Sequence, residues 1–291
     1  MKIAVTGSKG QVAASLAERA GPEVEIVALG RPAFDLEDRA SVLAGLKNAR
    51  PDVIVNAAAY TAVDKAEAEE KVAVRINGEG AGHVAEAAQQ LSVPLLHLST
   101  DYVFDGALAR PYREEDPTGP TGAYGRSKLI GEKLVAEQCS DSIILRTAWV
   151  YSPFGANFVR TMLRLNETRE EVAVVADQRG NPTSALDIAA TLIAIATRMK
   201  SDPSATLRGV FHMTGSGDAT WADFAEAVFS EAAARGRRLT RVRRISTADY
   251  PTPARRPANS RLDNGKLRRV YALELPEWRA SLAACCARLI I

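Results

Sequence analysis

Lys2-Ile3-Ala4-Val5-Thr6-Gly7-Ser8-Lys9-Gly10-Gln11-Val12-Ala13 is the stretch that decides the fold of this chain. It begins with a short β-branched run that predicts a strand, and a helical pattern follows its second glycine. Gly7 and Gly10 permit a tight turn between the two elements, and the backbone N–H groups that open such a helix can bind a pyrophosphate. Ala13 replaces the usual third glycine and still allows close helix packing. The stretch therefore predicts a nucleotide-binding strand–turn–helix unit.

The same alternation of short apolar runs and longer helical patterns continues over the first 150 residues, which is typical of a parallel sheet wound with helices. The predicted strands are Ile3 to Thr6, Glu25 to Leu29, Val53 to Asn56, Leu95 to Ser99 and Ile143 to Thr147. The predicted helices are Gln11 to Ala20, Arg39 to Asn48, Lys71 to Leu91 and Ala123 to Cys139. We expect an α/β, Rossmann-type doubly wound parallel sheet, with residues 1–150 forming an NAD(P)-binding domain.

The pattern loosens after about residue 150. Helices are predicted over Phe154 to Leu165, Ala185 to Met199 and Trp221 to Arg235, and strands over Glu171 to Val175 and Gly209 to Thr214. The basic, proline-broken stretch from Ile245 to Ser260 is expected to be irregular and to line or cover a pocket. Residues 151–291 therefore predict a smaller, mainly substrate-binding region, with some segments returning to the sheet.

The composition and net charge of the chain limit the partners that it is expected to bind. The chain has 291 residues, 46% of them hydrophobic and 25% charged, and a net charge of +2 that is too small to indicate nucleic acid or an acidic membrane surface. Its apolar stretches are shorter than the roughly 20 residues of a membrane span, and Met1 already opens a strand rather than a leader. Cys139, Cys285 and Cys286 show no metal-ligand spacing, so packed thiols are expected. We expect a cytoplasmic protein without nucleic-acid or membrane partners.

Polar or glycine-rich sequence follows each predicted strand at the point where the strand ends. Four segments fall there: Thr6-Gly7, Asn56 to Tyr60, Ser99-Thr100-Asp101 and Thr147-Ala148-Trp149. Because the carboxyl ends of parallel strands meet at one edge of the sheet, these residues predict the position of a binding site. Trp149 and Tyr151 either form a wall on which a substrate stacks or belong to the core.

Tyr124 and Lys128 lie four residues apart, on the same face of a predicted helix. An ammonium at this spacing is expected to lower the pKa of the phenol from about 10 toward working pH. Such a phenol can give a proton to a carbonyl oxygen, and the hydroxyl of Thr100 can hold the same oxygen. A nicotinamide cofactor over the glycine loop would supply hydride. The pattern predicts a nicotinamide-dependent carbonyl reductase.

The end of the second predicted strand bears on the choice of cofactor. NAD-specific folds tend to place an acidic residue there, for the ribose hydroxyls. This chain has Arg31 directly after Leu29-Gly30, and Asp35 a little later. A guanidinium can pair with a 2′-phosphate, which favours NADPH over NADH, although NADH stays possible. The alternative is that Arg31 is an ordinary surface arginine.

Motifs along almost the whole chain resemble those of the dTDP-4-dehydrorhamnose reductase family, within the extended short-chain dehydrogenase/reductase superfamily. The blocks are Gly7-x-x-Gly10-Gln11-Val12, Pro51 to Asp64 (PDVIVNAAAYTAVD), Ser99 to Phe104 (STDYVF), Tyr124-Gly125-x-x-Lys128, Arg146 to Tyr151 (RTAWVY), Asp177-Gln178-x-Gly180-x-Pro182-Thr183 and Arg256 to Ser260 (RPANS). The later blocks distinguish this family from the rest of the superfamily.

This resemblance implies a function: NADPH reduces the C4 ketone of dTDP-4-dehydro-L-rhamnose in the last step of dTDP-L-rhamnose synthesis. It implies that Tyr124 is the general acid, that Lys128 tunes it and holds the nicotinamide ribose, and that Thr100 polarises the C4 oxygen. Residues implied to lie along the cofactor are Gly10, Gln11, Val12, Ala57, Ala58 and Tyr60. Residues implied to contact the nucleotide sugar are Asp101 and Trp149 at the sugar, and Asn157, Arg179, Pro182 and Arg256 at the diphosphate.

The resemblance also bears on metal binding and assembly. Some family members form a dimer bridged by magnesium through glutamates, one of them on the first helix. This chain has Ser15 at that place. We therefore expect no metal, and either a monomer or a homodimer.

Two other functions stay open. A shared fold does not fix the substrate, so the chain could be a reductase or epimerase of another nucleotide sugar. The family also has a non-catalytic, NADP-binding relative that partners methionine adenosyltransferase, so the chain could be a regulatory subunit of that kind. The intact set of Thr100, Tyr124 and Lys128 favours an enzyme over such a regulatory subunit.

Overall fold

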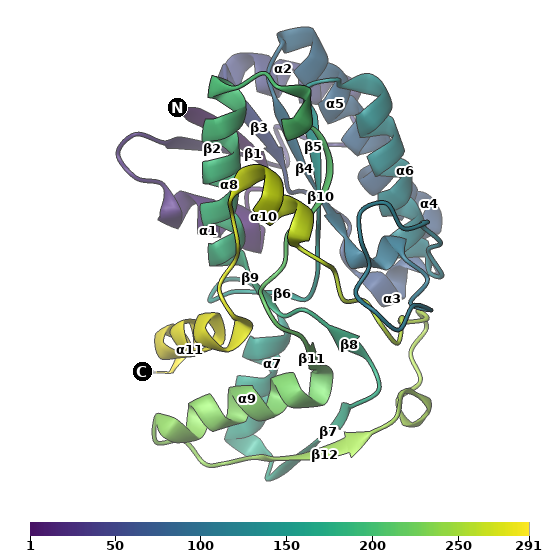
Figure 1. Cartoon of the computed structure of the whole chain (residues 1–291), viewed down its shortest axis with the longest axis vertical. Coiled ribbons are helices and arrows are strands. Elements are labelled where there is room, and N and C mark those ends of the chain that lie inside the picture. The colour runs from purple at the N-terminus through teal and green to yellow at the C-terminus, as the bar shows by residue number, and fades with distance from the viewer. Residues whose placement is uncertain (291) are drawn as a thin grey trace.

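The computed structural model describes residues 1–290. Its upper body in Figure 1 is built on a six-stranded sheet, in the order β10-β5-β4-β3-β1-β2, in which every neighbouring pair is parallel. The strands are β1 (Lys2–Thr6), β2 (Glu25–Leu29), β3 (Val53–Asn56), β4 (Leu95–Thr100), β5 (Ser142–Thr147) and β10 (Gly209–His212). The strand order reverses between β1 and β3, which confirms the predicted doubly wound α/β fold.

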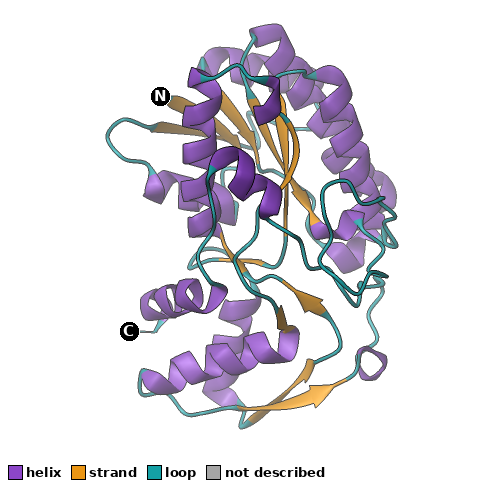
Figure 2. Ribbon diagram, in the orientation of Figure 1, coloured by secondary structure: helices purple, strands orange, loops and turns teal. Residues whose placement is uncertain are grey.

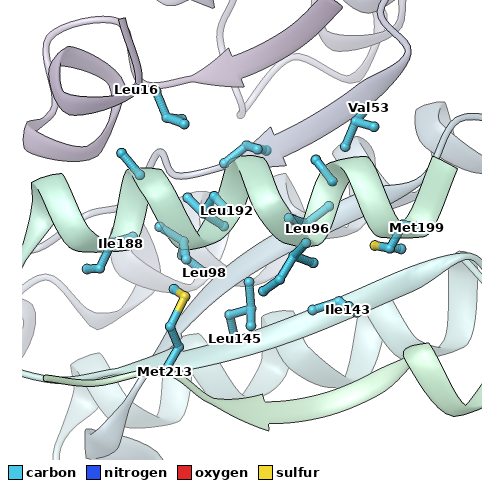
Figure 3. Packing of buried hydrophobic residues seen from close by; sticks show 14 of the residues in the cluster. Leu16, Val53, Leu96, Leu98, Ile143, Leu145, Ile188, Leu192, Met199 and Met213 are labelled. Atoms are coloured by element: carbon cyan, nitrogen blue, oxygen red, sulfur yellow. The ribbon is translucent and has the colours of Figure 1, made fainter. Parts of the chain in front are cut away.

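Helices cover both faces of this sheet, which makes the upper body three layers thick (Figure 1). One face carries α1 (Gln11–Arg19), α8 (Ala185–Ser201) and α10 (Gly265–Tyr271); the other carries α2 (Arg39–Ala49), α5 (Gly80–Leu91) and α6 (Ala123–Gln138). Figure 3 shows Ile188 and Leu192 of α8 beside Leu98 of β4, and Leu16 of α1 belongs to the same apolar cluster. Strands buried on both faces need continuous apolar runs, which is why their positions were readable from the sequence.

The lower body contains α7 (Phe158–Thr168), α9 (Trp221–Ala234) and α11 (Trp278–Leu289), packed around a separate apolar cluster that includes Phe224, Phe229 and Trp278. Its strands form two-stranded pairs and not one large sheet, and Figure 2 shows them in orange. They pair as β12 (Arg241–Ile245) with β7 (Glu171–Val175), β11 (Ala219–Thr220) with β8 (Arg179–Gly180), and β6 (Val150–Tyr151) with β9 (Thr183–Ser184).

Short helical turns complete the chain. They are α3 (Val63–Ala66), α4 (Glu70–Val74), the π-helical turn η1 (Arg75–Glu79), and the 3₁₀ turns η2 (Asp101–Val103), η3 (Ala205–Leu207) and η4 (Thr247–Asp249). Among residues 1–290, no helix combines the length and the apolar character that crossing a bilayer requires.

The structure corrects several predicted elements. The helix expected to start at Phe154 starts at Phe158, because Asn157 caps it, and it continues to Thr168. The single helix expected over Lys71 to Leu91 is divided by the wider turn η1. Strand β12 and helices α10 and α11 were not predicted. The strand expected from Gly209 does return to the sheet, where β10 pairs with β5 at one edge.

Candidate active site

A cleft of about 530 Å³ opens at the carboxyl ends of the central strands. Of the predicted site residues, it brings together Gly7, Gly10, Gln11, Val12, Arg31, Ala57, Ala58, Tyr124 and Lys128. The lining also includes Ala59, Ser99 and Thr147, which the strand-end argument named, and Ser8, Lys9 and Ala13 of the glycine stretch. Lining residues that the sequence did not mark as part of a site are Gly30, Thr61, Leu98, Val150, Gly155 and Ala156.

The glycine loop between β1 and α1 lines this cleft. Gly7 has φ +86°, a conformation that side chains disfavour, and a Cβ there would lie 3.0 Å from Ala58 Cα. The loop therefore packs directly against the end of β3. Gly10 precedes α1 and provides no side-chain cap, which leaves the first backbone N–H groups of the helix available to an anion.

Gln11 connects the glycine loop to the second half of the chain. Its Oε1 accepts hydrogen bonds from Ser152 Oγ at 2.8 Å and from Asn157 Nδ2 at 3.0 Å. Asn157 also caps α7 by accepting the N–H of Arg160 at 3.1 Å. The structure therefore places Asn157 beside Gln11 of the glycine loop.

Tyr124 lies in the first turn of α6, where the helix closely approaches η2. A Cβ on Gly125 would lie 2.1 Å from the carbonyl oxygen of Tyr102, so only glycine permits this approach. Tyr102 meets the Tyr124 ring edge-on, with centroids 5.9 Å apart.

The pKa of Tyr124 corrects an expectation. It is not lowered by Lys128 but raised to about 12, because burial and the negative charge of Asp101 both disfavour the phenolate, while Thr100 acts in the opposite direction. The raised pKa keeps the phenol protonated at neutral pH. Protonated phenol is the form that can donate a proton to a ketone.

Lys128 lies one helical turn beyond Tyr124 and is 3% exposed. Its Nζ donates to the carbonyl oxygen of Leu98 on β4 at 2.7 Å. Burial lowers the pKa of Lys128 to about 8, and the charge of Glu132 partly opposes this shift. The ammonium therefore loses its proton far more readily than an exposed lysine does.

Thr100 and Asp101 lie where β4 passes into η2. The Thr100 hydroxyl donates to Asp101 Oδ1 at 2.9 Å. Burial raises the pKa of Asp101 to about 6, and the nearby hydroxyls of Ser260 and Thr100 oppose this rise. Neither residue lines the cleft described above, but both act on Tyr124, which does.

Arg31 lines the cleft at the end of β2, as expected for a residue that contacts the far end of a dinucleotide. Its Nε lies 3.0 Å from Asp35 Oδ2 and its Nη2 lies 2.9 Å from Glu37 Oε2. Asp35 therefore reaches the site only through Arg31. Tyr60 does not line the cleft, and its hydroxyl donates a hydrogen bond to Glu69 Oε2 at 2.5 Å.

The aromatic residues after β5 have different environments. Trp149 has φ +47° and stacks on Trp221 with ring centroids 3.6 Å apart, and a Cβ on Gly180 would approach its ring to 2.4 Å. Tyr151 is fully buried, and its hydroxyl donates to the carbonyl oxygen of Trp278 at 3.2 Å. Tyr151 is a core residue, whereas Trp149 remains partly exposed beside the cluster.

The two arginines expected at the diphosphate already have carboxylate partners. Arg179 Nη2 lies 2.6 Å from Asp218 Oδ2, and Arg256 Nη2 lies 2.9 Å from Asp64 Oδ2. Pro182 is buried at the turn before β9. These residues lie outside the lining of the cofactor-sized cleft.

The described chain offers no cluster of three or more His, Cys, Asp or Glu side chains suited to a metal. Ser15 is fully buried on α1.

Comparison with known proteins agrees with this geometry. The sequence model of the family described as "RmlD substrate binding domain" matches residues 1–291. A dTDP-4-dehydrorhamnose reductase of Sinorhizobium fredii is 56% identical over 281 residues, which cover 97% of this chain and 95% of that protein.

Two solved structures extend the likeness to the fold. A dTDP-4-dehydrorhamnose reductase from Clostridium acetobutylicum has a TM-score of 0.92 at 34% identity, with 100% of both chains covered. The enzyme of the same name from Bacillus anthracis, solved in complex with NADP, has a TM-score of 0.91 at 35% identity, with 98% of each chain covered.

A Rossmann sheet whose glycine loop shares one cleft with a Tyr–Lys pair defines a reductase of the extended short-chain dehydrogenase/reductase type. Within that class, the chain belongs to the dTDP-4-dehydrorhamnose reductase family, as its motifs predicted.

Proposed function

We propose that this protein is an oxidoreductase that reduces the C4 ketone of dTDP-4-dehydro-L-rhamnose to dTDP-L-rhamnose with NADPH. The observation that carries the proposal is the convergence of the glycine loop, Tyr124 and Lys128 on one cleft, in a chain 56% identical to a protein of that name. NADH is the alternative cofactor.

The cleft fits a nicotinamide dinucleotide. The free N–H groups at the start of α1 suit its pyrophosphate, and Arg31 at the end of β2 suits a 2′-phosphate. When bound, the cofactor supplies hydride to the carbonyl carbon. Tyr124, protonated at neutral pH, gives its proton to the carbonyl oxygen, and Thr100 holds that oxygen in place. Lys128 contacts the nicotinamide ribose and returns a proton to Tyr124.

The substrate side is assigned by the same proposal. Residues 1–150 bind the cofactor, and residues 151–291 mainly bind the nucleotide sugar. Asp101 and Trp149 border the sugar, while Asn157, Arg179, Pro182 and Arg256 serve the diphosphate. The ion pairs of Arg179 with Asp218 and of Arg256 with Asp64 imply that each arginine exchanges a carboxylate for a phosphate when substrate binds.

We further propose that the protein works in the cytoplasm as a monomer or homodimer. The free and buried state of Cys139, Cys285 and Cys286 suits a reducing compartment.

The test is NADPH oxidation, followed by its absorbance, with dTDP-4-dehydro-L-rhamnose generated enzymatically in the cuvette. Turnover is expected in the wild-type protein and at least about 100-fold less in Tyr124→Phe, with NADPH binding preserved. NADPH binding without oxidation would reject this substrate. Other nucleotide sugars would then be assayed, and a partner protein sought by pull-down, since a regulatory subunit would behave in this way.

A further inference from the structure

Three buried polar side chains, Thr6, Asn56 and His97, form a hydrogen-bond chain across β1, β3 and β4. Thr6 Oγ1 accepts the backbone N–H groups of Ala57 at 3.1 Å and Ala58 at 2.9 Å, which occupies both of its lone pairs. Its own hydrogen therefore goes to Asn56 Oδ1, 2.7 Å away. This Thr6–Asn56–His97 relay starts at the wall of the cofactor cleft, because Ala57 and Ala58 line it.

The relay fixes which ring nitrogen of His97 carries the proton. Since Asn56 Oδ1 faces Thr6, Asn56 Nδ2 faces His97 Nδ1, at 3.0 Å, and donates to it. Nδ1 must accept, so the proton of the neutral ring resides on Nε2. Burial keeps the pKa of His97 well below its ordinary value, which keeps the ring neutral. Nε2 is buried and has no hydrogen-bond partner among residues 1–290.

The unpartnered N–H group lies on the same side of the sheet as Lys128. Side chains alternate along a strand, and Leu95, two residues before His97, packs in the same apolar cluster as Val135 of α6. Lys128 reaches in from α6 and bonds to the carbonyl of Leu98, the next residue after His97. The charge of Lys128 also contributes to the lowered pKa of His97, as expected for neighbours.

We propose that His97 is a positioning residue whose fixed N–H group prepares Lys128 to pass a proton to Tyr124; this inference rests on the proposed reductase activity. A fixed donor repels an ammonium and favours the neutral amine, which can accept its hydrogen bond. After Tyr124 has given its proton to the substrate oxygen, an N–H bond of Lys128 breaks and the O–H bond of Tyr124 forms again. The amine then accepts the His97 N–H group until it regains a proton from water.

Other ionisable groups surround His97 and Lys128, and the substitutions in the test leave these groups unchanged. They include Glu132 and Tyr124 on α6, Arg146 on β5, Asp101 and Tyr102 on η2, and Glu67 and Glu70 beside the start of α6. A change caused by the relay must therefore appear on altering Thr6 or His97 alone.

The experiment measures the pKa of Lys128 from the NMR shift of its ε-carbon across pH, in the protein without ligands. Thr6→Val removes the hydroxyl and frees Asn56 to turn its oxygen toward His97 Nδ1, so that Nε2 becomes an acceptor for the ammonium. The acid dissociation constant of Lys128 should fall about tenfold, the effect of one hydrogen bond. The control is Ser15→Ala, which removes a buried hydroxyl that has no hydrogen-bond partner in the described chain and lies outside the relay, and it should leave the constant unchanged.

A second readout is the ring-nitrogen NMR spectrum of His97, which should show hydrogen on Nε2 in the wild-type protein. Hydrogen on Nδ1, or an unchanged Lys128 constant in Thr6→Val, overturns the proposal. If Thr6→Val does not fold, His97→Asn serves instead: it keeps an oxygen for Asn56 and removes the N–H group that opposes the ammonium, so the acid dissociation constant of Lys128 must fall in the same direction. These measurements need no substrate, so they stand or fall separately from the reductase assay.

Discussion

Asp101 accepts the Thr100 hydroxyl at Oδ1, 2.9 Å away, and keeps its other oxygen, Oδ2, buried without a partner in the described chain. Burial raises the pKa of Asp101 to about 6. Burying a carboxylate away from water lowers the stability of the folded state, and natural proteins retain such groups mainly where function needs them. The position of Asp101 beside Tyr124 therefore implies that the site sacrifices stability for its chemistry.

Asp101→Asn should stabilise the protein at alkaline pH and leave it unchanged at acid pH. A carboxyl whose pKa rises from 3.8 to about 6 on folding favours the folded state below pH 3.8, and loses that contribution as pH rises through about 6. The neutral amide avoids this loss, so we expect a gain of about 2 to 3 kcal/mol at pH 8. Urea unfolding at pH 8 and pH 3.5 measures it. An equal gain at both pH values would contradict the assignment.

The buried pair of Arg146 and Glu132 makes a second prediction. Two hydrogen bonds of 2.9 and 2.7 Å join them, and each side chain is 5% exposed. Glu132→Gln leaves the guanidinium buried without a compensating charge, which should lower the free energy of unfolding by about 3 kcal/mol. Glu86→Gln, which breaks the exposed pair with Arg39, is the control and should cost less than about 1 kcal/mol. Equal, small losses in both variants would mean that the buried pair adds little.

The preference for NADPH over NADH should depend on Arg31 and on Glu37, one of the two carboxylates that pair with it. Arg31→Ala should weaken NADPH binding about tenfold or more and NADH binding much less, because only NADPH carries the 2′-phosphate. Glu37→Gln removes a competing partner 2.9 Å from the guanidinium and should tighten NADPH binding. Fluorescence titration with both cofactors measures these effects. If Arg31→Ala weakens both equally, the guanidinium does not contact the phosphate.

The strands that the sequence predicted best are those marked by a continuous apolar run. Strand β3 has the predicted bounds, Val53–Asn56, because a strand that is buried along its whole length requires a short apolar run between turns. Strand β2 also has its predicted bounds, Glu25–Leu29, although it lies at the edge of the sheet and is partly exposed. By contrast, β12 reads Arg241-Val-Arg-Arg-Ile245 and is mostly exposed. Its strand conformation comes from pairing with β7, a partner that local sequence does not reveal.

The candidate site likewise contains residues that local sequence patterns predict and residues that only the fold brings together. The glycine loop and the Tyr–Lys pair were readable because each is a local pattern on one element. The hydrogen bond of Asn157 to Gln11 and the ion pair of Arg256 with Asp64 join residues more than a hundred positions apart, so no spacing rule predicts them. The pKa of Tyr124 was misjudged for a related reason, since burial depends on what the fold packs around the phenol.

Gly125 should contribute to turnover, although it carries no functional group. Alanine normally favours a helix by about 1 kcal/mol over glycine, but here its Cβ would lie 2.1 Å from the Tyr102 carbonyl oxygen. Gly125→Ala must push α6 away from η2, which should lower stability by about 2 kcal/mol and turnover by about tenfold, because Tyr124 moves with the helix. Gly21→Ala, where a Cβ meets nothing within 4 Å, is the control for both measurements. A stable and fully active Gly125→Ala protein would show that α6 can shift without displacing the proton donor.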